Sequence, residues 1–209
     1  MGQDLSSGVD FAAARAAGIL SITEIDSTSL LRLTRFPATE PYWGKKKDYR
    51  FDDPAQVYGA TYTAFDIKVA FAETILHKNG YFTDNRWLID EKNILERHVV
   101  TYGRPLKPKL AVADLTGVRL KALGLNNDLC SSDDYTDSMA ISSALHAQLP
   151  DLDGIMYVSR QMNTDVAVAL FERSDVKVRS KAVRLLDHPA YDSLLDMFNV
   201  EILPSGRAP

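Results

Sequence analysis

Several features that define common classes of protein are missing from this 209-residue sequence. Cys130 is the single cysteine, so an intrachain disulfide is excluded, and we expect the thiol to be structural because no basic neighbour would lower its pKa. No apolar run approaches the roughly 20 residues that a membrane-spanning helix needs. The first residues also lack the basic segment and apolar core of a secretory signal. We therefore expect a cytoplasmic protein with no membrane contact.

The phosphate-binding and catalytic motifs of the commonest enzyme classes are missing as well. The sequence has no G-x-G-x-x-G, no G-x-x-x-x-G-K-[ST] and no G-x-S-x-G. Its four histidines do not form a metal-binding pair, and we expect each to be a surface or structural residue: His77, His98, His146 and His188. These absences exclude the usual dehydrogenase, ATPase, esterase and zinc-enzyme classes, so we expect neither a metal nor a cofactor.

The overall charge disfavours direct nucleic-acid binding. The formal net charge is −4 and the isoelectric point is near 5.6, whereas proteins that bind nucleic acids broadly are basic. The local exception is the run Lys45–Lys47, which follows Tyr42 and Trp43. This run is compatible with a phosphate-backbone contact and also with an ordinary solvated loop.

Apolar periodicity and helix-capping residues divide the chain into strands and helices that do not alternate evenly. This arrangement predicts an α+β protein, a single domain over residues 1–209 with a mixed, split β-sheet flanked by helices. A long irregular loop is expected at 36–54. In the stretch 81–108 the sequence pattern predicts only one element, the strand at 98–102. We expect helices at 11–17, at 67–78 with Asp66 as its cap, from Asp133 or Asp134 to 149, and at 189–198. We expect strands at 29–35, 60–64, 98–102, 110–115, 154–159, 166–172 and 200–203.

Glu73 is the first candidate for a functional side chain. It lies in the expected helix 67–78, which carries apolar Ile67, Phe71 and Ile75. A carboxylate on such a helix loses hydration and therefore needs a hydrogen-bond donor or has a function. The alternative is a glutamate at the edge of the core, with its stem buried and its carboxylate in water.

Two arginines raise the same question. Arg32 alternates with Leu31 and Leu33 in a strand, so a covered face would force its guanidinium to find an anion, and its planar fork suits phosphate. An exposed strand arginine is the alternative. Arg50 precedes Asp52 and Asp53 in the loop, where a local ion pair is the alternative.

Taken together, these segments resemble the RES domain family from about residue 30 to residue 172. The resemblance lies in the order and spacing of the blocks more than in any one of them. Tyr49 and Phe51 stand where the family's second block has glycine and tryptophan, so this match is loose. The matching blocks are Leu31-Arg32-Leu33, Tyr49–Pro54, the strand around Tyr62, Ala70-Phe71-Ala72-Glu73, Asp153-Gly154-Ile155 through Ser159-Arg160, and Val168–Phe171.

The resemblance implies an ADP-ribosyltransferase-like fold and an enzyme that consumes NAD as its substrate by breaking the nicotinamide–ribose bond. Glu73 would stabilise the developing charge on the ribose, and Arg32, also catalytic, would anchor the pyrophosphate. Arg50 would assist Arg32, Tyr62 would stack on the nicotinamide, and Ser159 would hydrogen-bond the adjacent ribose.

The resemblance leaves the acceptor open. Water would make the protein an NAD glycohydrolase, phosphate a phosphorylase, and a protein side chain a mono-ADP-ribosyltransferase. It also implies a toxin neutralised by an Xre-like helix-turn-helix antitoxin, with the loop 36–54 at the rim of their contact. A non-catalytic nucleotide-binding regulatory module is the rival from another class.

Overall fold

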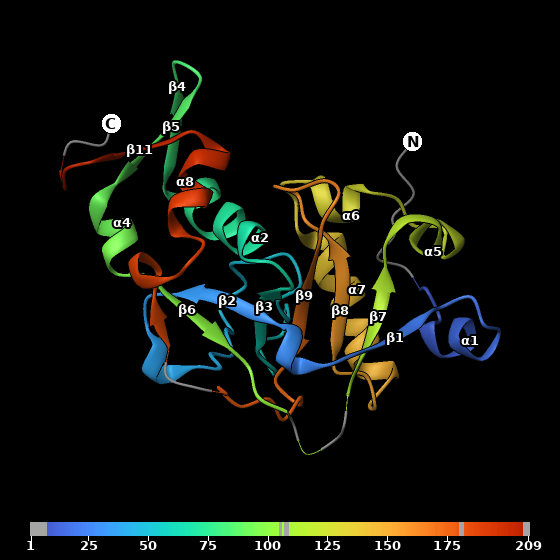
Figure 1. Ribbon diagram of the computed structural model, residues 1–209. Coiled ribbons are helices and arrows are strands. Elements are labelled where there is room, and N and C mark those ends of the chain that lie inside the picture. Colours follow the sequence, from blue (N-terminus) through green and yellow to red (C-terminus); the bar gives the residue numbers. More distant parts are fainter. Residues whose placement is uncertain (1–7, 105, 107–108, 180–181, 207–209) are drawn as a thin grey trace.

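The computed structural model describes residues 8–104, 106, 109–179 and 182–206. These residues form an eight-stranded mixed sheet and a three-stranded sheet (Figure 1). The small sheet contains, in spatial order, β11 (Val200–Leu203), β5 (Arg86–Asp90) and β4 (Gly80–Thr83). The large sheet contains, in spatial order, β1 (Ile22–Ile25), β7 (Leu110–Leu115), β8 (Gly154–Val158), β9 (Val166–Phe171), β3 (Ala60–Ala64), β2 (Leu31–Thr34), β6 (His98–Thr101) and β10 (Val183–Arg184).

The two faces of the large sheet are covered by different parts of the chain. In β9, Ala167, Ala169 and Phe171 pack into one apolar cluster, and the alternate residues Val168 and Leu170 pack into another. This is the two-residue period of a strand that is buried on both sides. The first cluster holds the buried apolar side chains of the helices, whereas strand and loop residues make up the second, so helices cover one face and loops cover the other.

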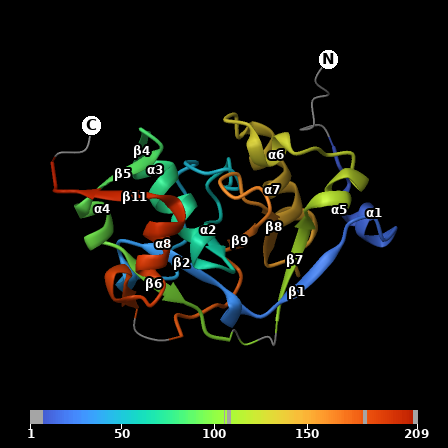
Figure 2. The same cartoon turned by 45° about the horizontal axis from the view of Figure 1, so that its top comes forward.

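All the α-helices except α1, which precedes β1, lie in connections between strands. α4 (Glu91–Leu95) and α8 (Tyr191–Phe198) lie with the small sheet at one end, and α1 (Phe11–Ala16) and α5 (Gly117–Ala122) lie at the other (Figures 1 and 2). The other helices are α2 (Ile67–Phe71), α3 (His77–Asn79), α6 (Asp128–Ser131) and α7 (Thr136–Gln148).

The large sheet opens between β2 and β3. β2 pairs with β6 through four residues, but it pairs with β3 only through Leu31 and Ala64. No further residues of these two strands are paired with each other, and the segment 35–59 connects the end of β2 to the start of β3. The α+β class and the split sheet expected from the sequence are therefore confirmed.

Most of the expected elements are present with shifts of one or two residues at their ends. The strand 60–64 is reproduced, and the helix predicted at 67–78 begins at Ile67, after Asp66 accepts a hydrogen bond from the Lys68 N–H. The cap expected at Asp133 or Asp134 is wrong, because α7 has Tyr135 at its N-cap. Asp134 instead accepts from the N–H of Thr136.

Several elements were missed because their sequences are short or polar: β1, β4, β5, β10, α4, α5 and α6. The hairpin of β4 and β5 fills the stretch where no pattern was visible. Its turn places Asp84 and Asn85 at positive φ, a backbone region in which Asp and Asn are among the most tolerated residues. In the described part of the chain, no helix has the length and apolar character needed to cross a membrane.

Candidate active site

A cavity of about 720 Å³ lies where β2 and β3 separate. Tyr62 packs against the apolar cluster on the helical face, whereas Arg32 stands opposite Val100, which belongs to the cluster on the loop face. Both side chains line the cavity because the strands are no longer paired at this point. The cavity is therefore formed by both faces of the sheet, with the segment 36–52 contributing a further wall.

Basic side chains outnumber acidic ones in the cavity wall. The acidic residues are Asp48, Asp52 and Glu73. This excess of positive charge, in a chain of net charge −4, favours an anionic ligand. The basic residues, apart from His77, are Arg32, Arg35, Lys46, Arg50, Lys78, Arg97 and Arg160.

Glu73 lies on a π-helical turn, Ala72–Leu76, that interrupts the helix following β3. Such turns are rare and occur frequently at functional sites. The Oγ of Ser159 donates a hydrogen bond of 2.6 Å to the Glu73 Oε1, and it accepts one from the N–H of Met162 at 3.1 Å. Ser159 is fully buried, so Glu73 presents its carboxylate to the cavity from a fixed support at the end of β8.

Tyr62 on β3 connects the cavity wall to the loop that carries Phe51 and Asp52. Its hydroxyl donates to the Asp52 Oδ1 at 2.8 Å and accepts from the N–H of Phe51 at 2.9 Å. Burial, followed by the charge of Asp52, raises the pKa of Tyr62 well above its usual value, so the phenol stays protonated. Burial also raises the pKa of Asp52, against the hydrogen bond from Tyr62. The ring of Tyr49 lies 5.3 Å from that of Tyr62.

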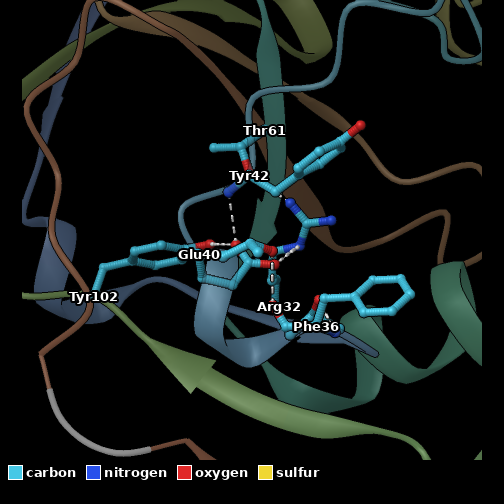
Figure 3. Close-up of polar contacts among 8 residues, drawn as sticks. Arg32, Phe36, Glu40, Tyr42, Thr61 and Tyr102 are labelled. Atoms are coloured by element: carbon cyan, nitrogen blue, oxygen red, sulfur yellow. Dashed lines mark hydrogen bonds and ion pairs between the residues drawn. The ribbon is translucent and has the colours of Figure 1, made fainter.

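Arg32 is held from two sides, as Figure 3 shows. Its Nη1 donates to the Thr61 Oγ1 at 2.6 Å, and its Nε lies 3.4 Å from the Glu40 Oε1. The other carboxylate oxygen of Glu40 accepts from the N–H of Tyr42 at 3.0 Å and from the hydroxyl of Tyr102 at 3.3 Å. Arg32 thus has an anionic partner and is not a free surface arginine.

Arg50 anchors the loop to the helices beside it. Its Nη1 donates to the carbonyl oxygens of Leu129 and Ser132, at 3.0 Å each, and its guanidinium lies 4.7 Å from the ring centre of Tyr135. Asp52 accepts from Tyr62 and from the N–H groups of Asp48 and Tyr49 instead of pairing with Arg50. The local ion pair considered for Arg50 is therefore not what holds it.

The structure brings Arg32, Arg50, Tyr62 and Glu73 into the wall of one cavity. Ser159, the fifth candidate, lies behind Glu73 and reaches the cavity through it. Four side chains from the segment 32–73 therefore meet at this place with Ser159, which lies 86 positions after Glu73.

Sequence reasoning missed other lining residues. His77 and Arg160 line the cavity. The sequence offered a signal for each that was not used: His77 is four residues after Glu73, and Arg160 follows Ser159. Burial lowers the pKa of His77, against the charge of Glu73. Arg97 lies in a segment without a recognisable pattern and gave no signal. Among the described residues, no group of three or more His, Cys, Asp or Glu side chains could hold a metal ion.

The structure also shows what surrounds the lysine run and the single cysteine. Lys45 forms an ion pair of 2.6 Å with Glu172, and Lys46 lines the cavity. The run is therefore divided between an ion pair and the cavity wall. Cys130 is 2% exposed, and burial raises the pKa of its thiol to about 11, which agrees with its expected structural role.

The fold and the site together define an α+β domain whose split sheet opens on a basic cavity with one oriented carboxylate. The family model of the RES domain matches residues 29–192, most of the chain, and the chain therefore belongs to the RES domain family. No curated protein matches the sequence.

Solved structures give a likeness in fold. One is a chain in the crystal structure of the M. tuberculosis MbcT–MbcA toxin–antitoxin complex, with a TM-score of 0.62 and 19% sequence identity. The alignment covers 89% of this chain and 97% of that chain. The aligned share of this chain is therefore larger than the segment 30–172 in which the sequence resembles the family.

Proposed function

We propose that the protein is a toxin that consumes NAD by cleaving the bond between nicotinamide and ribose. The observation that carries the proposal is Glu73, held by Ser159 at 2.6 Å, in the wall of a cavity that also presents the guanidinium of Arg32. Cleavage of an N-glycosidic bond builds positive charge on the ribose, which a fixed carboxylate stabilises. Guanidinium groups in the same cavity suit the negative charge of the pyrophosphate.

Each side chain has a separate task in this proposal. Glu73 faces the ribose carbon at which the bond breaks, and Arg32 binds the pyrophosphate. Tyr62 offers its ring to the nicotinamide, since its hydroxyl is occupied by Asp52. We assign Ser159 the task of orienting Glu73 in place of the expected ribose contact, because its hydroxyl is buried and donates to that carboxylate. Arg50 assists chiefly by fixing the loop wall.

The proposal is tested by incubating purified protein with NAD and measuring free nicotinamide. We expect release by the parent, and a loss on the order of a hundredfold or more in Glu73→Gln, which keeps the shape and removes the charge. Glu24→Gln is the matched control, because Glu24 lies on β1 in an exposed pair with Lys109. Binding of NAD without release by the parent would instead support a non-catalytic nucleotide-binding module.

The acceptor is identified in the same assay. ADP-ribose as the second product indicates water, ADP-ribose 1″-phosphate indicates inorganic phosphate, and label transferred from the adenine part of NAD to protein indicates a mono-ADP-ribosyltransferase. We favour water or phosphate, both small enough to enter beside a bound substrate.

An enzyme that drains NAD harms its own cell and requires a neutralising partner. Family membership and the likeness in fold to a chain from a toxin–antitoxin complex support an antitoxin for this chain, and we propose an Xre-like helix-turn-helix protein. Induced expression of the parent should stop growth, and Glu73→Gln should not. Growth at a normal rate with the parent folded and soluble would overturn the toxin proposal.

A further inference from the structure

Arg97 is a partly buried guanidinium for which the described part of the chain provides no ion-pair partner. It precedes β6 and lines the cavity, but neither the sequence motifs nor the matched blocks include it. Its Nε is buried and makes no hydrogen bond, and within the described residues no carboxylate lies at ion-pair distance from the group. Charged groups removed from water are normally paired, because losing hydration without compensation is costly.

The pairing of β2 with β6 brings a second arginine opposite Arg97. The strands are antiparallel, and their last paired position joins Thr34 to His98. Extending this register by one residue beyond the strand ends would set Arg35 opposite Arg97. Like charges that lie opposite each other repel, and because Arg35 is paired with Glu96, the uncompensated charge at this end of the strand pair is that of Arg97.

Arg32 adds a third guanidinium to the same end of the cavity. Burial, followed by the charges of Arg35 and then Arg32, lowers the pKa of Arg97 to about 10. Two carboxylates lie nearby, and each is already engaged. Glu40 pairs with Arg32 at 3.4 Å, and Glu96 pairs with Arg35 at 3.4 Å.

The other end of the cavity carries different charges. The carboxylate of Glu73 is hydrogen-bonded to Ser159 at the end of β8, whereas Arg97 precedes β6, and β9, β3 and β2 lie between these two strands in the sheet. The oriented carboxylate and the cluster of Arg32, Arg35 and Arg97 therefore lie toward different ends of the cavity. An anionic group of a ligand suits the arginine cluster, and a group that gains positive charge suits the end that carries Glu73.

We propose that Arg97, together with Arg32 and Arg35, forms a diphosphate-binding end of the cavity, and that Arg97 binds the anion directly. The proposal rests on the proposed function for the identity of the nucleotide, and on the arginine cluster itself for the diphosphate. An incoming diphosphate supplies two negative charges where three guanidinium groups share two carboxylates. Its oxygen atoms can accept hydrogen bonds from the terminal Nη groups of Arg97, since the Nε is buried.

Ligand binding tests the proposal without any turnover. Calorimetry with ADP and with adenosine, which lacks the diphosphate, is carried out on the parent, Arg97→Met, Arg97→Lys and Arg15→Met. Methionine keeps the apolar stem and removes the guanidinium. Arg15 is the matched control, because it pairs with Asp151 at the surface, on a helix that does not line the cavity.

We expect Arg97→Met to weaken ADP binding on the order of tenfold or more, as for the loss of a charge-assisted hydrogen bond. The ADP affinity of Arg97→Lys should lie between those of the parent and Arg97→Met, and the ADP affinity of Arg15→Met should equal that of the parent. Adenosine binding should be equal in all four proteins, and inorganic pyrophosphate should displace ADP from the parent. The variant should unfold at the same temperature as the parent or higher, because an unpaired charge has been removed.

Two results would overturn the proposal: a parent that binds ADP no better than adenosine, or an Arg97→Met protein that binds ADP as the parent does. Failure of the proposed function looks different. In that case ADP binding depends on Arg97 but the parent releases no nicotinamide. Conversely, the Arg97→Met protein could release nicotinamide with an unchanged KM for NAD. That result would support the proposed function and contradict the diphosphate-binding role of Arg97.

Discussion

The hydroxyl of Ser159 donates a 2.6 Å hydrogen bond to the carboxylate of Glu73 and so joins the end of β8 to the π-helical turn. The two residues are 86 positions apart in the sequence. A hydroxyl that is buried and bonded in this way fixes the direction of the carboxylate, which is the condition for electrostatic stabilisation without reorganisation.

Ser159→Ala should therefore lower the kcat of nicotinamide release on the order of tenfold while the KM for NAD stays nearly unchanged. The reason is that the substitution removes the orientation of Glu73 and not a substrate contact. Ser193→Ala, on the exposed side of α8, is the control. An increase in KM with an unchanged kcat would show that Ser159 contacts the substrate directly.

Tyr62→Phe should destabilise the protein by about 1–3 kcal/mol, because the buried Asp52 loses a donor and the Phe51 N–H loses its acceptor. Urea denaturation measures this difference, with Tyr81→Phe as an exposed control in β4. The ring remains in place, so a nicotinamide-stacking role predicts a smaller loss of NAD affinity than in Tyr62→Leu. Equal stability of Tyr62→Phe and Tyr81→Phe would contradict the role of this hydroxyl.

Cys130 should not react with a thiol reagent in the folded protein. Its side chain is buried, and a pKa of about 11 leaves roughly one thiolate in a thousand at pH 8. Colour development with a disulfide reagent should begin only when denaturant unfolds the chain. Rapid labelling under native conditions would mean that α6 opens readily or that the thiol is activated.

His146 should contribute to the acid sensitivity of the fold. It stacks on Tyr58 with ring centres 3.7 Å apart, and burial, followed by the charge of Arg173, lowers its pKa below the usual 6.5. The unfolded chain therefore binds a proton more readily than the folded protein does. This part of the stability is present above pH 6.5 and is lost as the pH falls through the folded-state pKa.

The measurement is the unfolding free energy of the parent and of His146→Phe between about pH 7.5 and pH 5.5. Phenylalanine retains an aromatic ring against Tyr58 and cannot be protonated. The variant should lose less stability than the parent across this range. Parallel curves for the two proteins would show that His146 does not titrate differently in the folded state.

The local part of the fold could be predicted from the sequence because its causes are local. The strand Ala60–Ala64 follows from its β-branched and aromatic residues, and the start of α2 follows from Asp66 as a cap. The ordered blocks with Arg32, Tyr62, Glu73 and Ser159 also carried the family resemblance, since these residues remain at recognisable spacing. The polar hairpin of β4 and β5 had no such pattern and was missed.

Only the tertiary structure decided what these residues do to one another. The split between β2 and β3 depends on a strand pairing that ends after Leu31 and Ala64, and this opening brings Arg32 and Tyr62 into one cavity from opposite faces. The partner of a buried charge is set by distance in space: Glu40 for Arg32, Ser159 for Glu73, and none among the described residues for Arg97. Sequence spacing fixes which residues share a strand or a helix turn, whereas the pairing of distant segments determines which charges meet.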